Sequence, residues 1–176
     1  MDRQELAERL GAVCRVQGHF VLRSGQEASV YFDKYLFEAD PVLLSAVAEH
    51  CARLVPSGTE VLAGLELGGV PLSTALSLLT GLPQVMVRKQ AKTYGTAKLA
   101  EGAELAGKRT LVVEDVITTG GQVVTSALQL RSLGATVGSV LCVIDRRPTG
   151  AAAPDKLAEA GLSVVSLFTA DDLGGT

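Results

Sequence analysis

The sequence predicts an α/β protein in which a parallel sheet is flanked by helices, with a small extension at the N-terminus. Two observations support this prediction: the expected strands are apolar along their whole length, and they alternate with helix-forming segments. Such strands are typical of parallel sheets that helices cover on both faces. The chain has 176 residues, 47% of them hydrophobic, which is enough for a single domain over 1–176 with a substantial core.

The N-terminal part, residues 1–40, is expected to form a helix followed by a hairpin-like extension. Apolar residues that recur three or four positions apart are typical of an amphipathic helix, here over 2–16. Glycines then punctuate two β-rich runs, which are expected to form strands over 20–22 and 29–32.

The core is expected over 41–176, with helices and strands in alternation. Pro41 fits the first turn of a helix, and glycines or prolines end most later segments. In open parallel sheets, ligands bind beyond the carboxyl ends of the strands, so chemistry is expected in the loops that follow the central strands. The expected helices cover 41–54, 71–79, 122–133 and 155–160, and the expected strands cover 61–65, 84–88, 109–113, 137–144 and 162–168.

Composition and charge exclude several classes of protein. The 16 basic and 19 acidic side chains give a net charge of −3, which argues against a general nucleic-acid binder and, with so many apolar residues, against a disordered chain. No apolar run reaches the ~18 residues of a membrane span, and the first residues lack the apolar segment of a signal peptide. Three widely spaced cysteines indicate neither a disulfide framework nor a zinc site. We therefore expect a cytoplasmic protein without membrane contact.

The segment 110–122, TLVVEDVITTGGQ, carries the sharpest signal. An apolar strand delivers Glu114 and Asp115, two threonines and two glycines follow, and a helix then begins. Glycines allow backbone N–H groups to converge on an anion, which the N-terminus of a helix also favours. Because side chains alternate along a strand, both acids can serve one ligand only if the strand ends there and the chain turns. The alternative interpretation is an ordinary helix cap.

The sequence VVEDVITTGG resembles the signature with which type I phosphoribosyltransferases bind phosphoribosyl pyrophosphate (PRPP). The resemblance implies a type I phosphoribosyltransferase-like fold, with Glu114 and Asp115 on the ribose hydroxyls of PRPP. It also implies that the 5-phosphate is bound by the loop formed by Val116, Ile117, Thr118, Thr119, Gly120 and Gly121.

A second segment concentrates positive charge. No acidic residue stands between Leu67 and Ala100, and this stretch contains the cations Arg88, Lys89, Lys92 and Lys98. In a chain of negative net charge such a cluster makes a local anion site, although a solvated basic loop is the alternative. The sequence RKQAKTYGT, followed by Glu101-Gly102, resembles the catalytic loop of orotate phosphoribosyltransferases.

That resemblance implies that Arg88, Lys89 and Lys92 bind the pyrophosphate of PRPP, with Lys92 also catalytic. In this family the loop reaches into the site of the partner subunit, which implies a homodimer that shares Lys92 and Tyr94 between subunits. Many members carry histidine where Tyr94 stands. A phenol with a pKa of ~10 is a poor proton carrier near neutral pH, so Tyr94 is interpreted as a hydrogen-bonding or phosphate-contacting group.

Residues 64–71, GLELGGVP, end a strand, turn through glycines and begin a helix. Val70 and Pro71 stand where a Walker A loop requires Lys and Ser or Thr, so hydrolysis of a nucleoside triphosphate is disfavoured. A packing turn is the plain interpretation. The resemblance makes Gly68 and Gly69 part of the pyrophosphate-binding loop, and some orotate enzymes have a lysine where Gly68 stands.

The N-terminal segment GHFVLRSG and the later SVYFD resemble the N-terminal hood of orotate phosphoribosyltransferases. The resemblance implies that orotate contacts Arg23, Tyr31 and Phe32 in the hood, and Thr118 and Arg146 in the core. From the residues alone, an arginine after the last long strand can bind a carboxylate bidentately, or simply face solvent.

Together, the resemblances imply transfer of the phosphoribosyl group of PRPP to orotate, giving orotidine 5′-phosphate and pyrophosphate. They imply Mg²⁺ as the cofactor, held mainly by PRPP oxygens and by no direct protein ligand. The catalytic residues would be Lys92, Glu114 and Asp115, acting by positioning and charge rather than through a covalent nucleophile.

Two alternatives remain open at this stage. A phosphoribosyltransferase for another nucleobase would not need Arg23 and Arg146. A non-catalytic regulator that senses PRPP would not need Lys92 beside the acid pair. The presence of all these residues favours an orotate enzyme.

Overall fold

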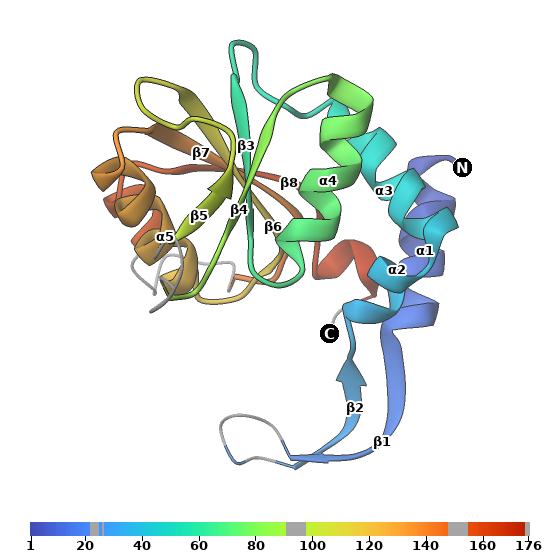
Figure 1. Ribbon diagram of the computed structural model, residues 1–176. Helices are drawn as coiled ribbons and strands as arrows, with labels where there is room; N and C mark the ends of the chain where they lie inside the picture. The colour runs from blue at the N-terminus through green and yellow to red at the C-terminus, as the bar shows by residue number, and fades with distance from the viewer. Residues whose placement is uncertain (22–24, 26, 91–97, 148–154, 175–176) are drawn as a thin grey trace.

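The computed structural model describes residues 1–21, 25, 27–90, 98–147 and 155–174. A six-stranded sheet lies between two layers of helices, and a two-stranded hairpin projects away from this body (Figure 1). No helix within these described ranges is long and apolar enough to cross a lipid bilayer. The helices are α1 (Arg3–Cys14), α2 (Tyr35–Ala39), α3 (Pro41–Ala52), α4 (Gly69–Thr80), α5 (Gly121–Ser132), α6 (Lys156–Glu159) and the 3-10 helix η1 (Asp171–Leu173). The strands are β1 (Arg15–Val21), β2 (Glu27–Phe32), β3 (Val61–Leu65), β4 (Gln84–Val87), β5 (Ala100–Gly102), β6 (Arg109–Ile117), β7 (Thr136–Asp145) and β8 (Ser163–Thr169).

The large sheet has the strand order β5-β4-β3-β6-β7-β8 and is parallel except for β5, which pairs antiparallel with β4. The predicted parallel sheet is therefore confirmed. The bounds of β3, β4, β7 and β8 agree with the predicted strands to within one residue at each end. Strand β5 escapes prediction because its three residues show no apolar pattern.

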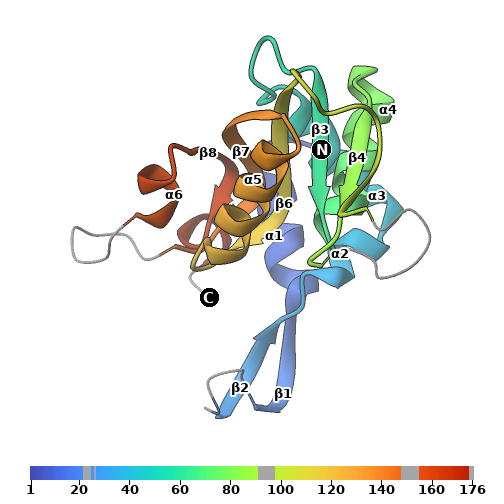
Figure 2. The ribbon, with the colours of Figure 1, turned by 60° about the vertical axis from the view of Figure 1, so that its left-hand side comes forward.

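Helices cover both faces of the sheet, as predicted. On one face, residues of α1, α3 and α4 share one buried cluster with Leu111 and Val113 of β6. On the other face α5 and α6 pack against Val112 of the same strand, and Figure 2 shows the sheet between the two layers. Alternate residues of β6 thus enter two separate cores, which is why this strand is apolar along its central part.

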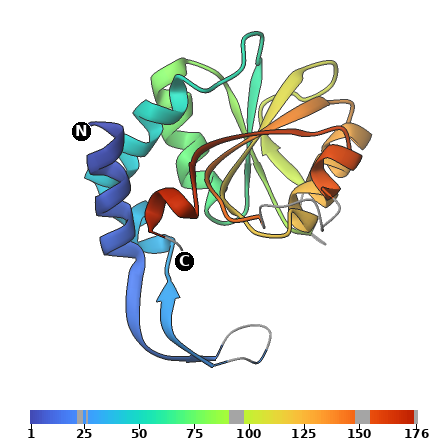
Figure 3. The same ribbon diagram turned by 180° about the vertical axis from the view of Figure 1, so that it is seen from behind.

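Strands β1 and β2 form the antiparallel hairpin that extends beyond the body, on the side where the chain ends (Figure 3). We call residues 15–34 the hood. The predicted first helix over 2–16 is too long, because Arg15 and Val16 pair with Phe32 and Tyr31 in the hairpin instead of continuing the helix. The first hood strand is correspondingly longer than the predicted 20–22.

The short helix α2 connects the hood to α3 and was not expected from the sequence pattern. It buries Phe37 in the core, which anchors the base of the hood. Helix α3 then begins with Pro41 at its first position, as predicted. The side chain of Asp40 caps it by accepting hydrogen bonds from the N–H groups of Val42 (2.8 Å) and Leu43 (3.1 Å).

Candidate active site

A cavity of about 360 Å³ opens at the carboxyl ends of the central strands. It lies between the loops after β3, β4 and β6 and the segment that joins the hood to α2. This is the edge of the sheet at which the topology predicts a ligand. The lining residues are Lys34, Tyr35, Glu66, Leu67, Lys89, Glu114, Val116, Ile117, Thr118, Thr119, Gly120, Gln122 and Val123.

The turn after β6 presents an open helix N-terminus to this cavity. Thr118 and Thr119 are exposed, and Gly120 has a φ of 72°, a conformation that favours glycine. Gly120 is also the N-cap residue of α5, and as a glycine it has no side chain that could accept from the first-turn amides. Free amides at a helix N-terminus favour an anion, so the turn has the features of a phosphate site.

The strand that carries the acid pair is longer than predicted. The predicted strand ends at Val113, but β6 continues to Ile117. Its partner β7 has ten residues against the nine of β6 and pairs with Glu114, Val116 and Ile117, so the ladder continues past the acids. The chain therefore turns after Ile117, and Glu114 and Asp115 are still strand residues.

As a result, the two acids are placed differently. Glu114 is 8% exposed and lines the cavity, whereas Asp115 is completely buried. The Lys34 ammonium lies 2.6 Å from Oδ2 of Asp115, and the N–H of Val116 donates to Oδ1 at 2.6 Å. The carboxyl group of Glu38, from α2, also shares a hydrogen bond with Asp115.

Glu38, Glu114 and Asp115 form a carboxyl cluster, in which burial and mutual contact shift the pKa values in opposite directions. Burial, followed by hydrogen bonding to Asp115, raises the pKa of Glu114 to about 9 and that of Glu38 to about 8. Burial alone would also raise the pKa of Asp115, but hydrogen bonds with Glu114 and Glu38 and the Lys34 charge lower it below its ordinary value. The cluster therefore keeps Asp115 ionised while the two glutamates retain their protons at neutral pH.

Gly68 and Gly69 are both buried, and the cavity wall beside them is formed by Glu66 and Leu67. Gly68 has an ordinary φ of −68°, so glycine is required there for space. A Cβ atom at Gly68 would overlap the carboxylate of Asp115 and would lie 2.5 Å from Oε1 of Glu38. Contact of these two glycines with pyrophosphate stays a prediction.

The basic segment after β4 enters the cavity through Lys89. The backbone N–H of Lys89 donates to Oε2 of Glu66 at 3.1 Å, which ties this loop to the loop after β3. Arg88 is half-buried and does not line the cavity. The predicted site residues Lys92, Tyr94 and Arg23 lie outside the described residues.

The two aromatic residues of the hood face different neighbours. The ring of Tyr31 lies 5.5 Å from that of Phe20, within the hairpin. The ring of Phe32 lies 5.6 Å from the guanidinium of Arg146, at the end of β7. Because neighbouring strand residues point to opposite faces, the two rings have different neighbours, and contact of Tyr31 and Phe32 with orotate stays a prediction. Phe32 and Arg146 do come together.

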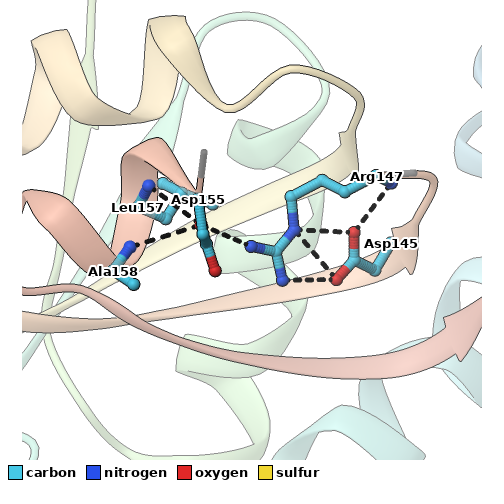
Figure 4. Close-up of polar contacts among 5 residues, drawn as sticks. All are labelled: Asp145, Arg147, Asp155, Leu157 and Ala158. Atoms are coloured by element: carbon cyan, nitrogen blue, oxygen red, sulfur yellow. Dashed lines mark hydrogen bonds and ion pairs between the residues drawn. The ribbon is translucent and has the colours of Figure 1, made fainter. Parts of the chain in front are cut away.

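The two arginines after β7 have separate surroundings (Figure 4). Arg147 donates to both carboxylate oxygens of Asp145, at 2.8 to 3.2 Å, and to Oδ1 of Asp155 at 2.9 Å. Asp155 in turn caps α6 by accepting from the N–H groups of Leu157 and Ala158. Among the described residues, no carboxylate pairs with Arg146, whose guanidinium lies over the ring of Phe32.

Several residues of the cavity wall were not predicted as site residues. The two with the most evident chemistry are Lys34 and Glu66, and Glu38 lies behind the wall in contact with Asp115. A lysine directly after the second hood strand is the one local signal for Lys34. Its partner Asp115 is 81 positions later in the chain, which no local pattern reveals.

The chain is similar in sequence to proteins of known function. Residues 41–171 match the phosphoribosyl transferase domain family. The orotate phosphoribosyltransferase of Nocardioides sp. (strain ATCC BAA-499 / JS614) is 55% identical over 168 residues, which cover 96% of this chain and 92% of that protein. The orotate phosphoribosyltransferase of Methanocella arvoryzae is 41% identical over 172 residues, which cover 97% of each.

The fold is also similar to that of solved structures. The crystal structure of Mycobacterium tuberculosis H37Rv orotate phosphoribosyltransferase in complex with PRPP superposes with a TM-score of 0.82. The two chains are 32% identical, and the match covers 99% of each. The alignment therefore spans the hood as well as the core.

Proposed function

The chain belongs to the phosphoribosyl transferase family and, within it, to the orotate phosphoribosyltransferases, and from this we propose how its residues perform the transfer. The reaction moves the phosphoribosyl group of PRPP to orotate, giving orotidine 5′-phosphate and pyrophosphate in pyrimidine biosynthesis. One observation carries the assignment to residues: a single cavity unites the Thr/Gly turn, an acid of the signature, a cation of the basic segment and the base of the hood.

PRPP is proposed to lie along the carboxyl edge of the sheet. The turn 116–121 binds the 5-phosphate, supported by the open N-terminus of α5. Glu114 binds the ribose hydroxyls from the cavity wall. Direct contact of Asp115 with the ribose stays a prediction, because its carboxylate is buried behind Lys34. The pyrophosphate group lies toward residues 66–69, which we call the pyrophosphate loop.

The chemical step is a displacement at the sugar C1, in which the bond to pyrophosphate breaks and a bond to orotate forms. Positive charge from Arg88, Lys89 and Lys92 neutralises the departing pyrophosphate, with Lys92 the proposed catalytic cation. The cofactor is proposed to be a Mg²⁺ ion held mainly by PRPP oxygens. Such an ion would add further positive charge at the leaving group.

Orotate is proposed to lie between the hood and the end of β7. Arg146 pairs with its carboxylate, supported by the absence of a competing carboxylate among the described residues. Phe32 covers the base from the hood side, and Thr118 lies at the junction with the phosphate turn. Arg23 and Tyr31 are further proposed contacts from the hood.

We also propose a homodimer in which the loop with Lys92 and Tyr94 serves the site of the partner subunit. The hood supports this assembly, because it projects from the body and exposes Val21, Val30 and Tyr31. A cytoplasmic location is proposed as well. The three cysteines are buried free thiols, which suits a reducing compartment.

Loss of the ultraviolet absorbance of orotate tests the function directly. The purified protein is mixed with orotate, PRPP and Mg²⁺, and we expect Mg²⁺-dependent loss of the signal. Lys92→Ala is expected to lower turnover far more than it weakens orotate binding, because Lys92 acts mainly on the departing group.

Two other outcomes would each be informative. Equal losses of turnover and orotate binding in Lys92→Ala would contradict a transition-state role for Lys92. No orotate consumption by the wild-type protein, with PRPP still bound in calorimetry, would overturn the orotate assignment and favour another base or a regulator.

A further inference from the structure

One cation in the wall of the cavity has no part in the scheme above. Lys34 follows the last strand of the hood, and its side chain is 31% exposed. It lines the cavity together with Glu66, Leu67 and Lys89, on the side of the pyrophosphate loop. Its ammonium lies 2.6 Å from Oδ2 of the completely buried Asp115. Lys34 thus places a positive charge where the leaving group is proposed to bind.

The pyrophosphate loop has no cation of its own. Residues 64–71 contain neither lysine nor arginine. Position 68 has no room for a side chain, because Oδ2 of Asp115 and Oε1 of Glu38 fill the space next to it. Oδ2 of Asp115 is also the atom that pairs with Lys34. The Lys34 ammonium therefore lies close to Gly68, in contact with the same carboxylate oxygen.

The surroundings of Lys34 fix both its charge and its position. Burial alone would lower its pKa, but the charge of Asp115 and the hydrogen bond to it raise the pKa above the ordinary lysine value. The ammonium also lies 5.4 Å from the centre of the Tyr35 ring. A charge that is already oriented needs little rearrangement when an anion binds, which favours binding.

We propose that Lys34 binds the pyrophosphate group of PRPP, and that the buried Asp115 carboxylate is the counter-ion that holds Lys34 in place. This inference rests on the proposed function and adds a cation from the hood to those of the basic segment. It also links the two substrates. Phe32, two residues before Lys34, lies against Arg146, so one short segment contacts both the orotate and the pyrophosphate parts of the site.

Calorimetry with two partial ligands tests the proposal. Inorganic pyrophosphate and ribose 5-phosphate are titrated separately, each with Mg²⁺, into the wild-type protein, Lys34→Met and Lys34→Arg. We expect Lys34→Met to weaken pyrophosphate binding about tenfold or more, because a charge-assisted contact is lost. Ribose 5-phosphate affinity should stay unchanged, and Lys34→Arg should recover most of the pyrophosphate affinity.

Two further variants separate binding from folding. Lys108→Met makes the same chemical change at the opposite end of β6, where Lys108 pairs with Glu60 at 3.3 Å, and should leave both affinities unchanged. Lys34→Met alone leaves the buried Asp115 unpaired, which endangers folding. The double variant Lys34→Met/Asp115→Asn also removes the buried charge, so folding is no longer endangered. Its affinity for pyrophosphate should be lower than that of the wild-type protein, as in Lys34→Met.

Three results would be decisive against a claim made above. Unchanged pyrophosphate affinity in both the single and the double variant would overturn the proposal. A loss confined to ribose 5-phosphate would also overturn it, and would make Lys34 a positioning residue that acts on the ribose through Asp115. A wild-type protein that binds PRPP but never consumes orotate would instead overturn the proposed function, whatever the Lys34 variants do.

Discussion

Gly68 shows how one residue connects the acid pair to the loop after β3. Its backbone conformation is open to any residue, yet the carboxyl groups of Asp115 and Glu38 occupy the space of its missing side chain. The resemblance predicts that this glycine belongs to a pyrophosphate-binding loop. In the structure, the groups that approach it are two carboxyl groups of the protein itself.

Gly68→Ala should therefore destabilise the protein by about 1–3 kcal/mol, because the added methyl group overpacks the carboxyl cluster. Urea unfolding followed by circular dichroism measures the change. Gly138→Ala is the matched control, since a Cβ there meets no atom within 4 Å and the residue is exposed. Equal stability of the two variants would contradict the crowding argument.

The raised pKa of Glu38 should make the free energy of unfolding depend on pH. Its pKa is raised to about 8, chiefly by burial and then by Asp115, so the folded protein holds this proton more tightly than the unfolded chain. The associated stability is present in full at acidic pH and is lost as the pH rises to about 8.

Glu38→Gln cannot ionise and should show a shallower fall in melting temperature between pH 5 and pH 9 than the wild-type protein. Some fall should remain, because the pKa of Glu114 is raised to about 9. Melting temperatures at a series of pH values check this. Parallel curves for the two proteins would show that Glu38 does not hold the extra proton.

At the scale of the elements, the connection from β7 to α6 assigns different tasks to two neighbouring arginines. Arg147 joins Asp145, at the end of β7, to Asp155, the cap of α6, and so holds the two ends of the connection together (Figure 4). Arg146 instead lies against the hood through Phe32. The pair of basic residues in the sequence contains no signal that separates these roles.

Arg147→Ala should cost about 1–3 kcal/mol of stability, because the charged hydrogen bonds to Asp145 are lost. Arg146→Ala should leave stability nearly unchanged and raise the KM for orotate about tenfold or more, since a paired contact to a carboxylate disappears. Chemical unfolding and steady-state kinetics on both variants measure the two effects. The reverse pattern would exchange the roles of the two arginines.

Predictions for the elements succeed where the signal is local. Strand β3 appears with its predicted bounds, since an apolar run between turn residues is a sufficient signal. The first helix is overestimated because Val16 fits the helical spacing, while the pairing of Val16 with Tyr31 ends the helix two residues earlier. Strand β6 is underestimated because polar residues end the apolar pattern but do not end the ladder with β7.

At the scale of the whole molecule, the three thiols report on the integrity of the two cores. Cys14, Cys51 and Cys142 are all completely buried. Burial raises the pKa of Cys14 to about 11 and that of Cys51 to about 12, so very little reactive thiolate forms at neutral pH. Their modification therefore requires opening of the structure.

The native protein should react slowly with an aromatic disulfide reagent, and all three thiols should react rapidly in denaturant. Saturating PRPP with Mg²⁺ should slow the native reaction further, because a ligand that binds only the folded state lowers the population of open states. Absorbance of the released thiolate gives the rates. Rapid release from the native protein would show that the cores open far more readily than their packing indicates.

The sequence was sufficient for the α/β class, for most strands and for the motifs of the phosphate turn and acid pair. These depend on hydrophobic periodicity and on glycine and proline signals, which act over a few neighbouring residues. Only the tertiary structure shows that Asp115 is buried against Lys34 while Glu114 lines the cavity. The same holds for the separate roles of Arg146 and Arg147. Charge, burial and crowding at these positions arise from residues on other elements, distant in the chain, and folding alone brings them into contact.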